Sequence, residues 1–132
     1  MAASPVLADS SYYVRLLRED RDPLKSLALA VASRDVAVCG VVRCEVGRGI
    51  RRLKTLQLFQ AAWNVMINVP TDNRLWAEVE STAWQLDRAG TILPLPDLVI
   101  ACCAKRIGAV VLTFDEHFQK IPGLRAVNQL DT

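Results

Sequence analysis

Four acidic residues stand where an acidic metal site needs them, at the ends of apolar runs or near helix starts. They are Asp9, Glu45, Asp97 and Asp115. Asp9 ends the apolar run 5–8, and Asp115 ends the run 110–114. Glu45 follows the run 36–42, and Asp97 opens another. Each acid alone also fits a structural role as a helix cap or turn residue. Their joint pattern favours a site.

The chemistry of such a site follows from the charges. The carboxyl ends of strands in an open parallel sheet face one crevice, where ligands bind. Carboxylates gathered there repel one another unless a cation neutralises them. Mg²⁺ prefers oxygen ligands of this kind, and two or three carboxylates suffice for one ion because it keeps several waters. One or two Mg²⁺ or Mn²⁺ ions supply what phosphodiester cleavage requires.

The elements that would position these acids alternate between strands and helices. Apolar runs predict strands at residues 6–9, 36–41, 66–69 and 109–114, with a short fifth at 124–127. Periodicity and capping residues predict helices at residues 10–18, 23–34, 42–50, 53–65, 73–89 and 97–107. The connector 93–96 is expected to be extended, with Asp97 at or near the next helix N-cap. We therefore predict a three-layer α/β/α sandwich around a central parallel sheet of four to five strands.

Composition agrees with one soluble globular domain over residues 1–132. The chain is 52% hydrophobic and 23% charged, with a net charge of +2 that is too small to identify a partner. There are four cysteines, at positions 39, 44, 102 and 103, and one histidine, so a tetrahedral zinc site is poorly supported. The adjacent Cys102 and Cys103 in an apolar helix suggest buried, reduced thiols, and a redox pair is the alternative.

The termini and apolar runs give an expected location. The N-terminus lacks a basic segment ahead of an apolar stretch, so no signal peptide is expected. The apolar run near Leu98 is broken by Lys105 and Arg106, so no membrane span is expected. Together with the unpaired cysteines, this predicts a cytoplasmic protein that does not contact a membrane.

Four segments of the sequence resemble the PIN-domain ribonucleases, and the likeness is closest to VapC-type toxins of toxin–antitoxin pairs. The resemblance covers nearly the whole chain, and its C-terminal third is the specific part. The segments are Val-Leu-Ala-Asp-Ser-Ser at 6–11, Cys-Glu-Val at 44–46, Pro-Asp-Leu-Val-Ile-Ala at 96–101 and Leu-Thr-Phe-Asp-Glu-His-Phe at 112–118. The ending Phe-Gln-Lys-Ile-Pro-Gly-Leu at 118–124 is also similar.

The resemblance implies a metal-dependent endoribonuclease acting as a type II toxin. It implies that Asp9, Glu45, Asp97 and Asp115 are catalytic and bind Mg²⁺ or Mn²⁺. Ser11 and Thr113 match positions that usually hold small hydroxyl or amide residues supporting the acids. The implied partners are an RNA substrate, a cognate antitoxin and a second copy of the chain in a homodimer.

Two positions depart from the family pattern. Val42 stands where the family commonly has the Ser or Thr that caps the helix of the glutamate. His117 stands where the family often has a second aspartate after the fourth acid. Neither departure removes one of the four acids, but a missing outer carboxylate makes a second metal ion less certain. We expect a surface histidine at 117, and contact with the substrate phosphate is the alternative.

Basic and aromatic residues suggest contact surfaces. Twelve of the 16 basic residues are Arg, which binds phosphate in bidentate pairs. Four of them surround Glu45 and are candidates for RNA or antitoxin contact, unless they only solvate a helix face: Arg43, Arg48, Arg51 and Arg52. Aromatic residues are enriched in interfaces. We expect at least one large aromatic residue at a subunit or antitoxin surface, with Trp63 and Trp76 favoured over Tyr12, Tyr13 and Trp84.

Three other functions remain open at this point. One is a related nuclease for DNA or RNA processing without a toxin role. Another is a catalytically inactive, nucleic-acid-binding version of the same fold. The third is a phospho-receiver domain, which also gathers acids beside a parallel sheet. Asp9 is followed by two serines rather than by a second acid, and no lysine stands beside Asp115, so the receiver is disfavoured.

Overall fold

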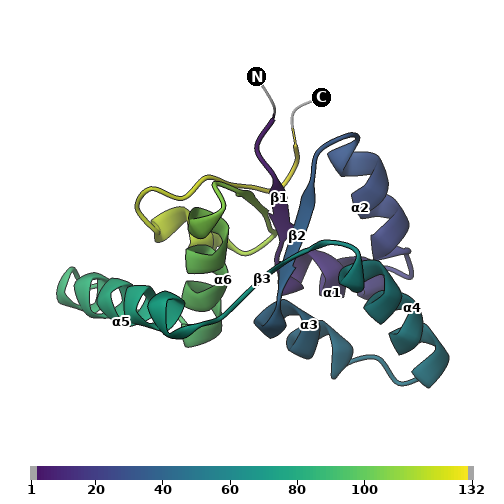
Figure 1. Ribbon diagram of the computed structural model, residues 1–132, viewed down its shortest axis with the longest axis horizontal. Coiled ribbons are helices and arrows are strands. Elements are labelled where there is room, and N and C mark those ends of the chain that lie inside the picture. The colour runs from purple at the N-terminus through teal and green to yellow at the C-terminus, as the bar shows by residue number, and fades with distance from the viewer. Residues whose placement is uncertain (1–2, 131–132) are drawn as a thin grey trace.

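Five short strands form one parallel sheet in the order β3–β2–β1–β4–β5 in this computed structural model, which describes residues 3–130 (Figure 1). The strands are β1 (Val6–Ala8), β2 (Val36–Cys39), β3 (Ile67–Val69), β4 (Val110–Leu112) and β5 (Ala126–Val127). The helices are α1 (Ser10–Arg18), α2 (Pro23–Val31), α3 (Gly40–Gly47), α4 (Leu53–Asn64), α5 (Asn73–Arg88), α6 (Leu95–Arg106) and the 3₁₀ helix η1 (Glu116–Lys120).

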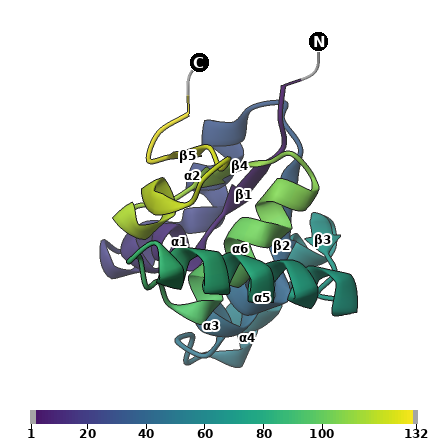
Figure 2. The same ribbon diagram turned by 90° about the vertical axis from the view of Figure 1, so that its left-hand side faces the viewer.

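Helices cover both faces of this sheet. Figure 1 shows α5 and α6 on one side of the strands and α1, α2 and α4 on the other. Figure 2, turned by 90°, brings α5 and α6 in front of the strands. The strands of the sheet interior are buried on both faces, as expected for parallel strands flanked by helices. The predicted three-layer sandwich with a central parallel sheet is confirmed.

The strand order creates a switch point between β1 and β4. From β1 the chain moves outward through β2 to β3, and it then crosses back to place β4 on the other side of β1. Val6 pairs with Val36 on one side and with Val110 on the other. Because the two connections diverge from this point, the carboxyl ends of β1 and β4 border an open crevice. Asp9 and Asp115 follow these two strands.

The N-terminal ends of helices match the capping residues expected. The Asp22 side chain accepts hydrogen bonds from Leu24 N at 3.0 Å and Lys25 N at 3.3 Å, and Pro23 occupies the first turn of α2. The Asp72 side chain accepts from Leu75 N at 2.9 Å to begin α5. The end of α2 was placed too late, because the helix stops at Val31 and not near Arg34.

Two predicted boundaries near the site were wrong. The strand 36–41 ends at Cys39, and the helix expected at 42–50 is α3, Gly40–Gly47. Gly40 and Val41 therefore belong to the helix and not to the strand, while Val42, which was predicted in the helix, is fully buried there.

The predicted start of the helix at Asp97 was two residues late. Helix α6 begins at Leu95, with Pro94 as its N-cap residue, so Asp97 lies near the N-cap, in the first turn, but does not cap the helix itself. Pro96 is tolerated there because the first helical N–H groups have no partner within the helix. The expected extended connector is thus shorter than residues 93–96, and the other strand ends differ from prediction by at most two residues.

An aromatic cluster packs α1 against α4. Trp63 is 1% exposed, and its ring centroid lies 5.4 Å from that of Phe59 and 6.0 Å from that of Tyr13. The prediction that Trp63 lies at an interface was therefore wrong, because this residue fills the core. Trp76 and Trp84 on α5 are exposed and stay available for contacts. The cluster fixes α1, whose first turn carries the site residues.

The burial expected for Cys102 and Cys103 is confirmed. Cys39, Cys102 and Cys103 are buried and Cys44 is exposed, and all four are free thiols. No helix within residues 3–130 combines the length and apolar character that crossing a bilayer requires.

Candidate metal centre

Asp9 anchors the site at the end of β1. It is the N-cap of α1, and its Oδ1 accepts hydrogen bonds from Tyr12 N at 3.3 Å and from the Ser11 hydroxyl at 2.8 Å. The residue is only 2% exposed. Burial raises the pKa of Asp9 to about 6, against the opposing effect of these hydrogen bonds. A carboxylate held in this way is costly to ionise unless a cation lies nearby.

Two hydroxyl groups connect the ends of β1 and β4. Ser11 Oγ lies 3.2 Å from Thr113 Oγ1 and accepts a hydrogen bond from Phe114 N at 3.0 Å. Thr113 Oγ1 in turn accepts from Asp115 N at 2.9 Å. Since Ser11 donates its hydroxyl proton to Asp9, Thr113 is the donor between the two hydroxyls. The link holds the segment that carries Asp115 beside Asp9, which is the structural support predicted for these two residues.

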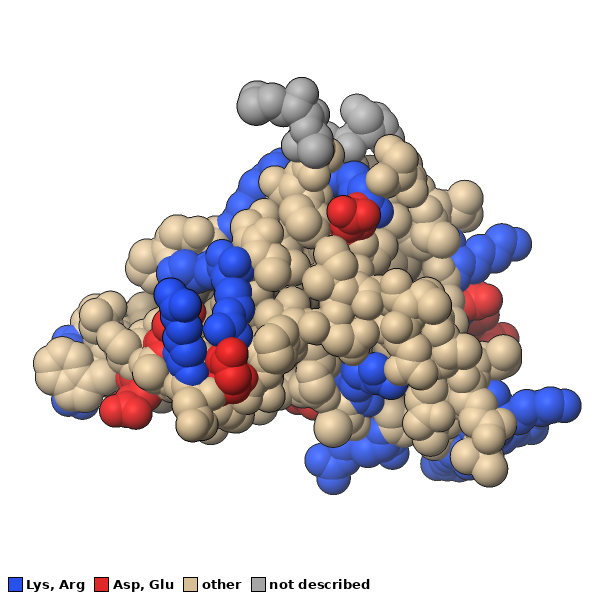
Figure 3. Space-filling view, viewed as in Figure 1, with Lys and Arg blue, Asp and Glu red and all other residues tan. Residues whose placement is uncertain are grey.

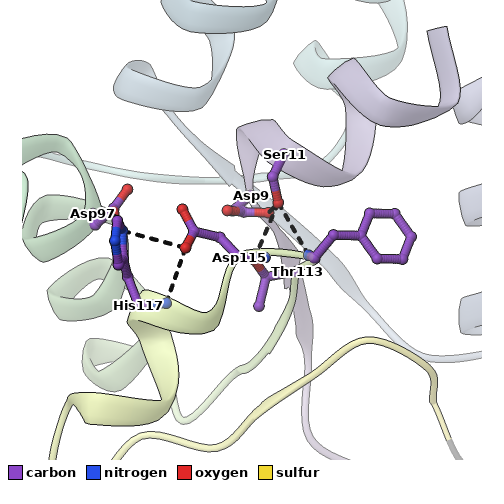
Figure 4. Close-up of polar contacts among 7 residues, drawn as sticks. Asp9, Ser11, Asp97, Thr113, Asp115 and His117 are labelled. Carbon is purple, nitrogen blue, oxygen red and sulfur yellow. Dashed lines mark hydrogen bonds and ion pairs between the residues drawn. The ribbon is translucent and has the colours of Figure 1, made fainter. Parts of the chain in front are cut away.

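Asp115 and Asp97 approach each other from η1 and α6. Asp115 caps η1 by accepting a hydrogen bond from His117 N at 2.9 Å. His117 Nδ1 lies 3.0 Å from Asp97 Oδ2 and 3.2 Å from Asp115 Oδ1. Figure 4 shows the imidazole beside Asp97 and facing Asp115, with Asp9 on the other side of Asp115. The side chain of His117 is 42% exposed, so the expected surface histidine is found, but its ring also lies between two site carboxylates.

Glu45 completes the set of predicted acids from α3. Its Oε1 accepts a hydrogen bond from the Ser10 hydroxyl at 2.6 Å, which ties α3 to the first residue of α1. Its negative charge and that of Asp115 both raise the pKa of Asp97, although burial is the larger cause and His117 acts in the opposite direction. The four acids thus come from four elements and influence one another.

Two of the acids form a group of potential metal ligands together with His117. One ligand atom each of Asp97, Asp115 and His117 lies within 4.8 Å of the others. Asp9 and Glu45 lie beside this group but outside it. Two carboxylate oxygens and an imidazole nitrogen are a donor set that fits a divalent cation.

The candidate arginines divide into two kinds. Arg43 donates to Asn68 Oδ1 at 3.0 Å and to Asn64 Oδ1 at 2.9 Å, so its guanidinium is held against α4 and β3. Arg48 lines a hollow that also contains Glu45. Arg51 and Arg52 are exposed in the connection between α3 and α4. Figure 3 shows basic side chains gathered along the lower edge of the molecule, beneath α3 and the start of α4.

Sequence reasoning missed three contributions to the site. It did not predict the hydrogen bond from Ser10 to Glu45. It also did not predict that the Arg15 guanidinium lies over the Phe114 ring, with its carbon 4.4 Å from the ring centroid. It also did not assign His117 to the carboxylate group. The spacing of Asp115 and His117 could have indicated this contact, because a short turn brings the side chain of His117 back toward that of Asp115.

Comparisons with known proteins were made once this geometry was established. A family model described as PIN domain matches residues 6–124. The fold is similar to a chain of DNA-bound VapBC from Salmonella typhimurium, with a TM-score of 0.76, 19% identity, and 95% and 98% of the two chains covered. A search of curated protein sequences finds no match.

Two further solved structures share the fold. One is VapBC2 from Rickettsia felis bound to a promoter DNA fragment, with a TM-score of 0.70, 19% identity, and 93% of this chain and 97% of that chain covered. The other is VapBC-5 from Mycobacterium tuberculosis, of the VapBC family of toxin–antitoxin systems, with a TM-score of 0.62, 19% identity, and coverage of 95% and 97%. At these identities the likeness shows the fold alone.

The raised pKa of Asp9 predicts that Asp9→Asn stabilises the metal-free protein, and increasingly so as pH rises. The folded-state pKa of about 6 lies above the ordinary value of 3.8, so the contribution of Asp9 to stability is full below 3.8 and is lost as pH rises through about 6. Asn keeps an acceptor oxygen but does not ionise. From about pH 4 to about pH 8, the stability of the variant relative to wild type should rise by about 2–3 kcal/mol.

Urea unfolding in EDTA at both pH values measures this change. Asp87→Asn, on the exposed surface of α5, is the control for the substitution type. A difference between Asp9→Asn and wild type that stays constant with pH contradicts a raised pKa.

Proposed function

The chain belongs to the PIN-domain family, and on that premise we propose that it is a metal-dependent endoribonuclease and the toxin of a type II toxin–antitoxin pair. PIN domains are in general nucleases. The observation that carries the proposal is the convergence of Asp97, Asp115 and His117 within 4.8 Å, with Asp9 beside them at the end of β1 and Glu45 beside them on α3, which follows β2.

The residues present fit a divalent cation, Mg²⁺ or Mn²⁺. Asp97 and Asp115 would hold it, and Asp9 and Glu45 would contribute directly or through water. A bound cation supplies charge relief on the phosphodiester and a more acidic water. The protein contributes position: the hydroxyls of Ser11 and Thr113 fix the carboxylates, and buried Asp9 gains most from a nearby positive charge.

A basic hollow beside the acids supports an RNA substrate. It has a volume of about 560 Å³ and is continuous with the acid group through Glu45. Among the residues that line it are Ser10, Arg15, Arg18, Glu45, Arg48 and Phe114. The three arginines are exposed, so their charge is available to backbone phosphates.

An aromatic stack on one wall of this hollow suits an unpaired strand. The Phe114 ring stacks on that of Tyr12 at a centroid distance of 5.5 Å and an interplanar angle of 13°. Arg15 lies over the same ring. Both faces of the Phe114 ring are thus covered, so an unpaired base would stack on the exposed guanidinium plane of Arg15, which lines the hollow. On this ground we favour single-stranded RNA over a duplex.

Asp97→Asn should reduce cleavage by about 100-fold or more, because Asn retains the shape of the side chain and loses the charge that a cation requires. The fold should survive, since the Asp97 side chain caps no helix and its partner is the part-exposed side chain of His117. The assay incubates wild type and variant with total RNA, with single-stranded DNA and with duplex RNA, each with and without Mn²⁺, and maps the ends produced.

Thermal melting provides a second readout of the same substitution. Mn²⁺ should raise the melting temperature of wild type more than NaCl of equal ionic strength does, and Asp97→Asn should lose this difference. Asp87→Asn is again the matched control. Cleavage by Asp97→Asn at the wild-type rate would show that Asp97 takes no part in catalysis. Cleavage by wild type without a metal ion would contradict the proposed function.

Arg48→Ala should weaken RNA binding without changing the nature of the products. Loss of one phosphate contact weakens binding to all RNA sequences similarly. It also makes the logarithm of the association constant fall less steeply with the logarithm of salt concentration, by roughly 1 unit of slope. Fluorescence anisotropy with a labelled oligoribonucleotide in EDTA measures this, with Arg88→Ala on α5 as the control. An unchanged slope for Arg48→Ala, or an equal effect of Arg88→Ala, rules out the hollow as the RNA path.

The proposed partners are a cognate antitoxin and a second copy of the chain. An apolar hollow of about 390 Å³ between α2 and α4, lined in part by Leu24, Leu27 and Val65, suits an apolar helix of an antitoxin. Trp76 and Trp84 are 43% and 60% exposed on α5 and suit a subunit contact.

The assembly prediction is a homodimer at micromolar concentration, measured by sedimentation velocity, and Trp76→Glu should shift it toward monomer. The physical reason is that a charge would be buried in the contact. Trp76 is exposed in the single chain, so this variant should keep its fold by circular dichroism. If wild type is strictly monomeric, the predicted dimer is wrong. If Trp76→Glu leaves the dimer unchanged, the contact between the subunits does not involve this part of α5.

A further inference from the structure

The only histidine of the chain lies within the group of metal-ligand candidates, and this position has a chemical consequence. His117 Nδ1 is 3.0 Å from Asp97 Oδ2 and 3.2 Å from Asp115 Oδ1. At these distances either the Nδ1–H donates a hydrogen bond to the carboxylates, or Nδ1 and the carboxylates share a metal ion. Nδ1 is thus placed where a ligand atom would be, and not on the outer side of the carboxylates.

The backbone holds the ring in this place. Asp115 Oδ1 accepts the hydrogen bond from His117 N at 2.9 Å, so the residue that would share the ion also closes the turn that positions the imidazole. The neighbouring Phe118 is fully buried and fixes η1 to the core. Among the described residues, Asp97 Oδ1 and Asp115 Oδ2 have no hydrogen-bond partner, which leaves one oxygen of each carboxylate available.

Nitrogen changes which ions the site accepts. Mg²⁺ binds oxygen ligands and water almost exclusively, whereas imidazole suits Fe²⁺, Ni²⁺, Cu²⁺ and Zn²⁺. Mn²⁺ also favours oxygen ligands, but it accepts an imidazole more readily than Mg²⁺ does. A site made only of carboxylates distinguishes weakly between Mg²⁺ and Mn²⁺. One imidazole among two carboxylates gives the transition-metal ion a ligand from which Mg²⁺ gains little.

We propose that His117 is a direct ligand of the cation through Nδ1, and that it makes this site select first-row transition-metal ions against Mg²⁺. The proposal rests on the metal dependence proposed above and extends it to the identity of the ion. In this arrangement the ring proton resides on Nε2, and the half-exposed side chain lets that N–H bond to water.

Electron paramagnetic resonance of Mn²⁺ tests this in the absence of RNA. Because the chain has one histidine, nitrogen coupling of imidazole type in the spectrum of bound Mn²⁺ identifies His117 once any purification tag is removed. Wild type should show this coupling and His117→Asp should not. Loss of the free Mn²⁺ signal gives the affinity, and competition with Mg²⁺ gives the ratio of the two dissociation constants.

The expected change is that His117→Asp narrows the preference for Mn²⁺ over Mg²⁺ by at least about tenfold, because a carboxylate restores an oxygen ligand. Glu116→Gln is the matched control in the same 3₁₀ helix. It removes a charge next to the site, which changes both affinities alike and leaves the ratio unchanged. Circular dichroism and melting in EDTA show whether each variant is folded.

The outcomes separate this inference from the proposed function. Nitrogen coupling together with a narrowed ratio in His117→Asp supports the inference, even if the protein then cuts no RNA. The inference is overturned if wild type cuts RNA but shows no nitrogen coupling, and if His117→Asp has the same ratio of Mn²⁺ and Mg²⁺ dissociation constants as wild type. The proposed function then still stands. In that case His117 contacts Asp97 from outside the ligand set or meets the substrate phosphate. Absence of any Mn²⁺ binding overturns both.

Discussion

The cost of gathering carboxylates where β1 and β4 end, from burial first and from mutual repulsion second, is the constraint on which the rest of this structure depends. Asp9 is almost fully buried, and the charges of Asp115 and Glu45 both disfavour ionisation of Asp97. Such a group destabilises a fold unless other interactions hold it together and a positive charge neutralises it. Most of the local structure serves these two requirements.

The requirement to hold the acids together is met by hydroxyl groups and helix ends. Ser11 and Thr113 connect two strand ends that are about a hundred residues apart in sequence, and Asp9 and Asp115 each cap the helix that follows them. The aromatic cluster of Tyr13, Phe59 and Trp63 fixes α1 against α4. The acids are therefore placed by packing and hydrogen bonds that do not depend on the ligand.

The positive charge belongs at the centre of the group, where the ring of His117 lies between Asp97 and Asp115 and where we propose that the cation binds. The basic hollow of Arg15, Arg18 and Arg48 lies to the side of the acids, next to Glu45. This separation suits a site in which a cation occupies the centre and the polynucleotide backbone lies along the flank. The apolar hollow between α2 and α4 is a separate surface and serves a different kind of partner.

The sequence by itself determined the sheet, the order of elements and the place of each acid along them. Apolar runs predict buried parallel strands because both faces are covered, and capping residues such as Asp22 and Asp72 act through their immediate neighbours. Such features are local, so one sequence suffices to find them. Boundaries near Gly40 and Leu95 were missed because burial of the following residues decided where those helices begin.

Only the tertiary structure decided which side chains meet. Trp63 is a residue type that is enriched in interfaces, yet it lies in the core because the face of α4 that carries it packs against α1. Arg43 is close to Glu45 in sequence, yet it is held by Asn64 and Asn68 on other elements. His117 contacts Asp97, which is 20 residues away, because η1 and α6 meet beside the end of β4. Contacts of this kind depend on how whole elements pack, and local sequence does not encode the distance between them.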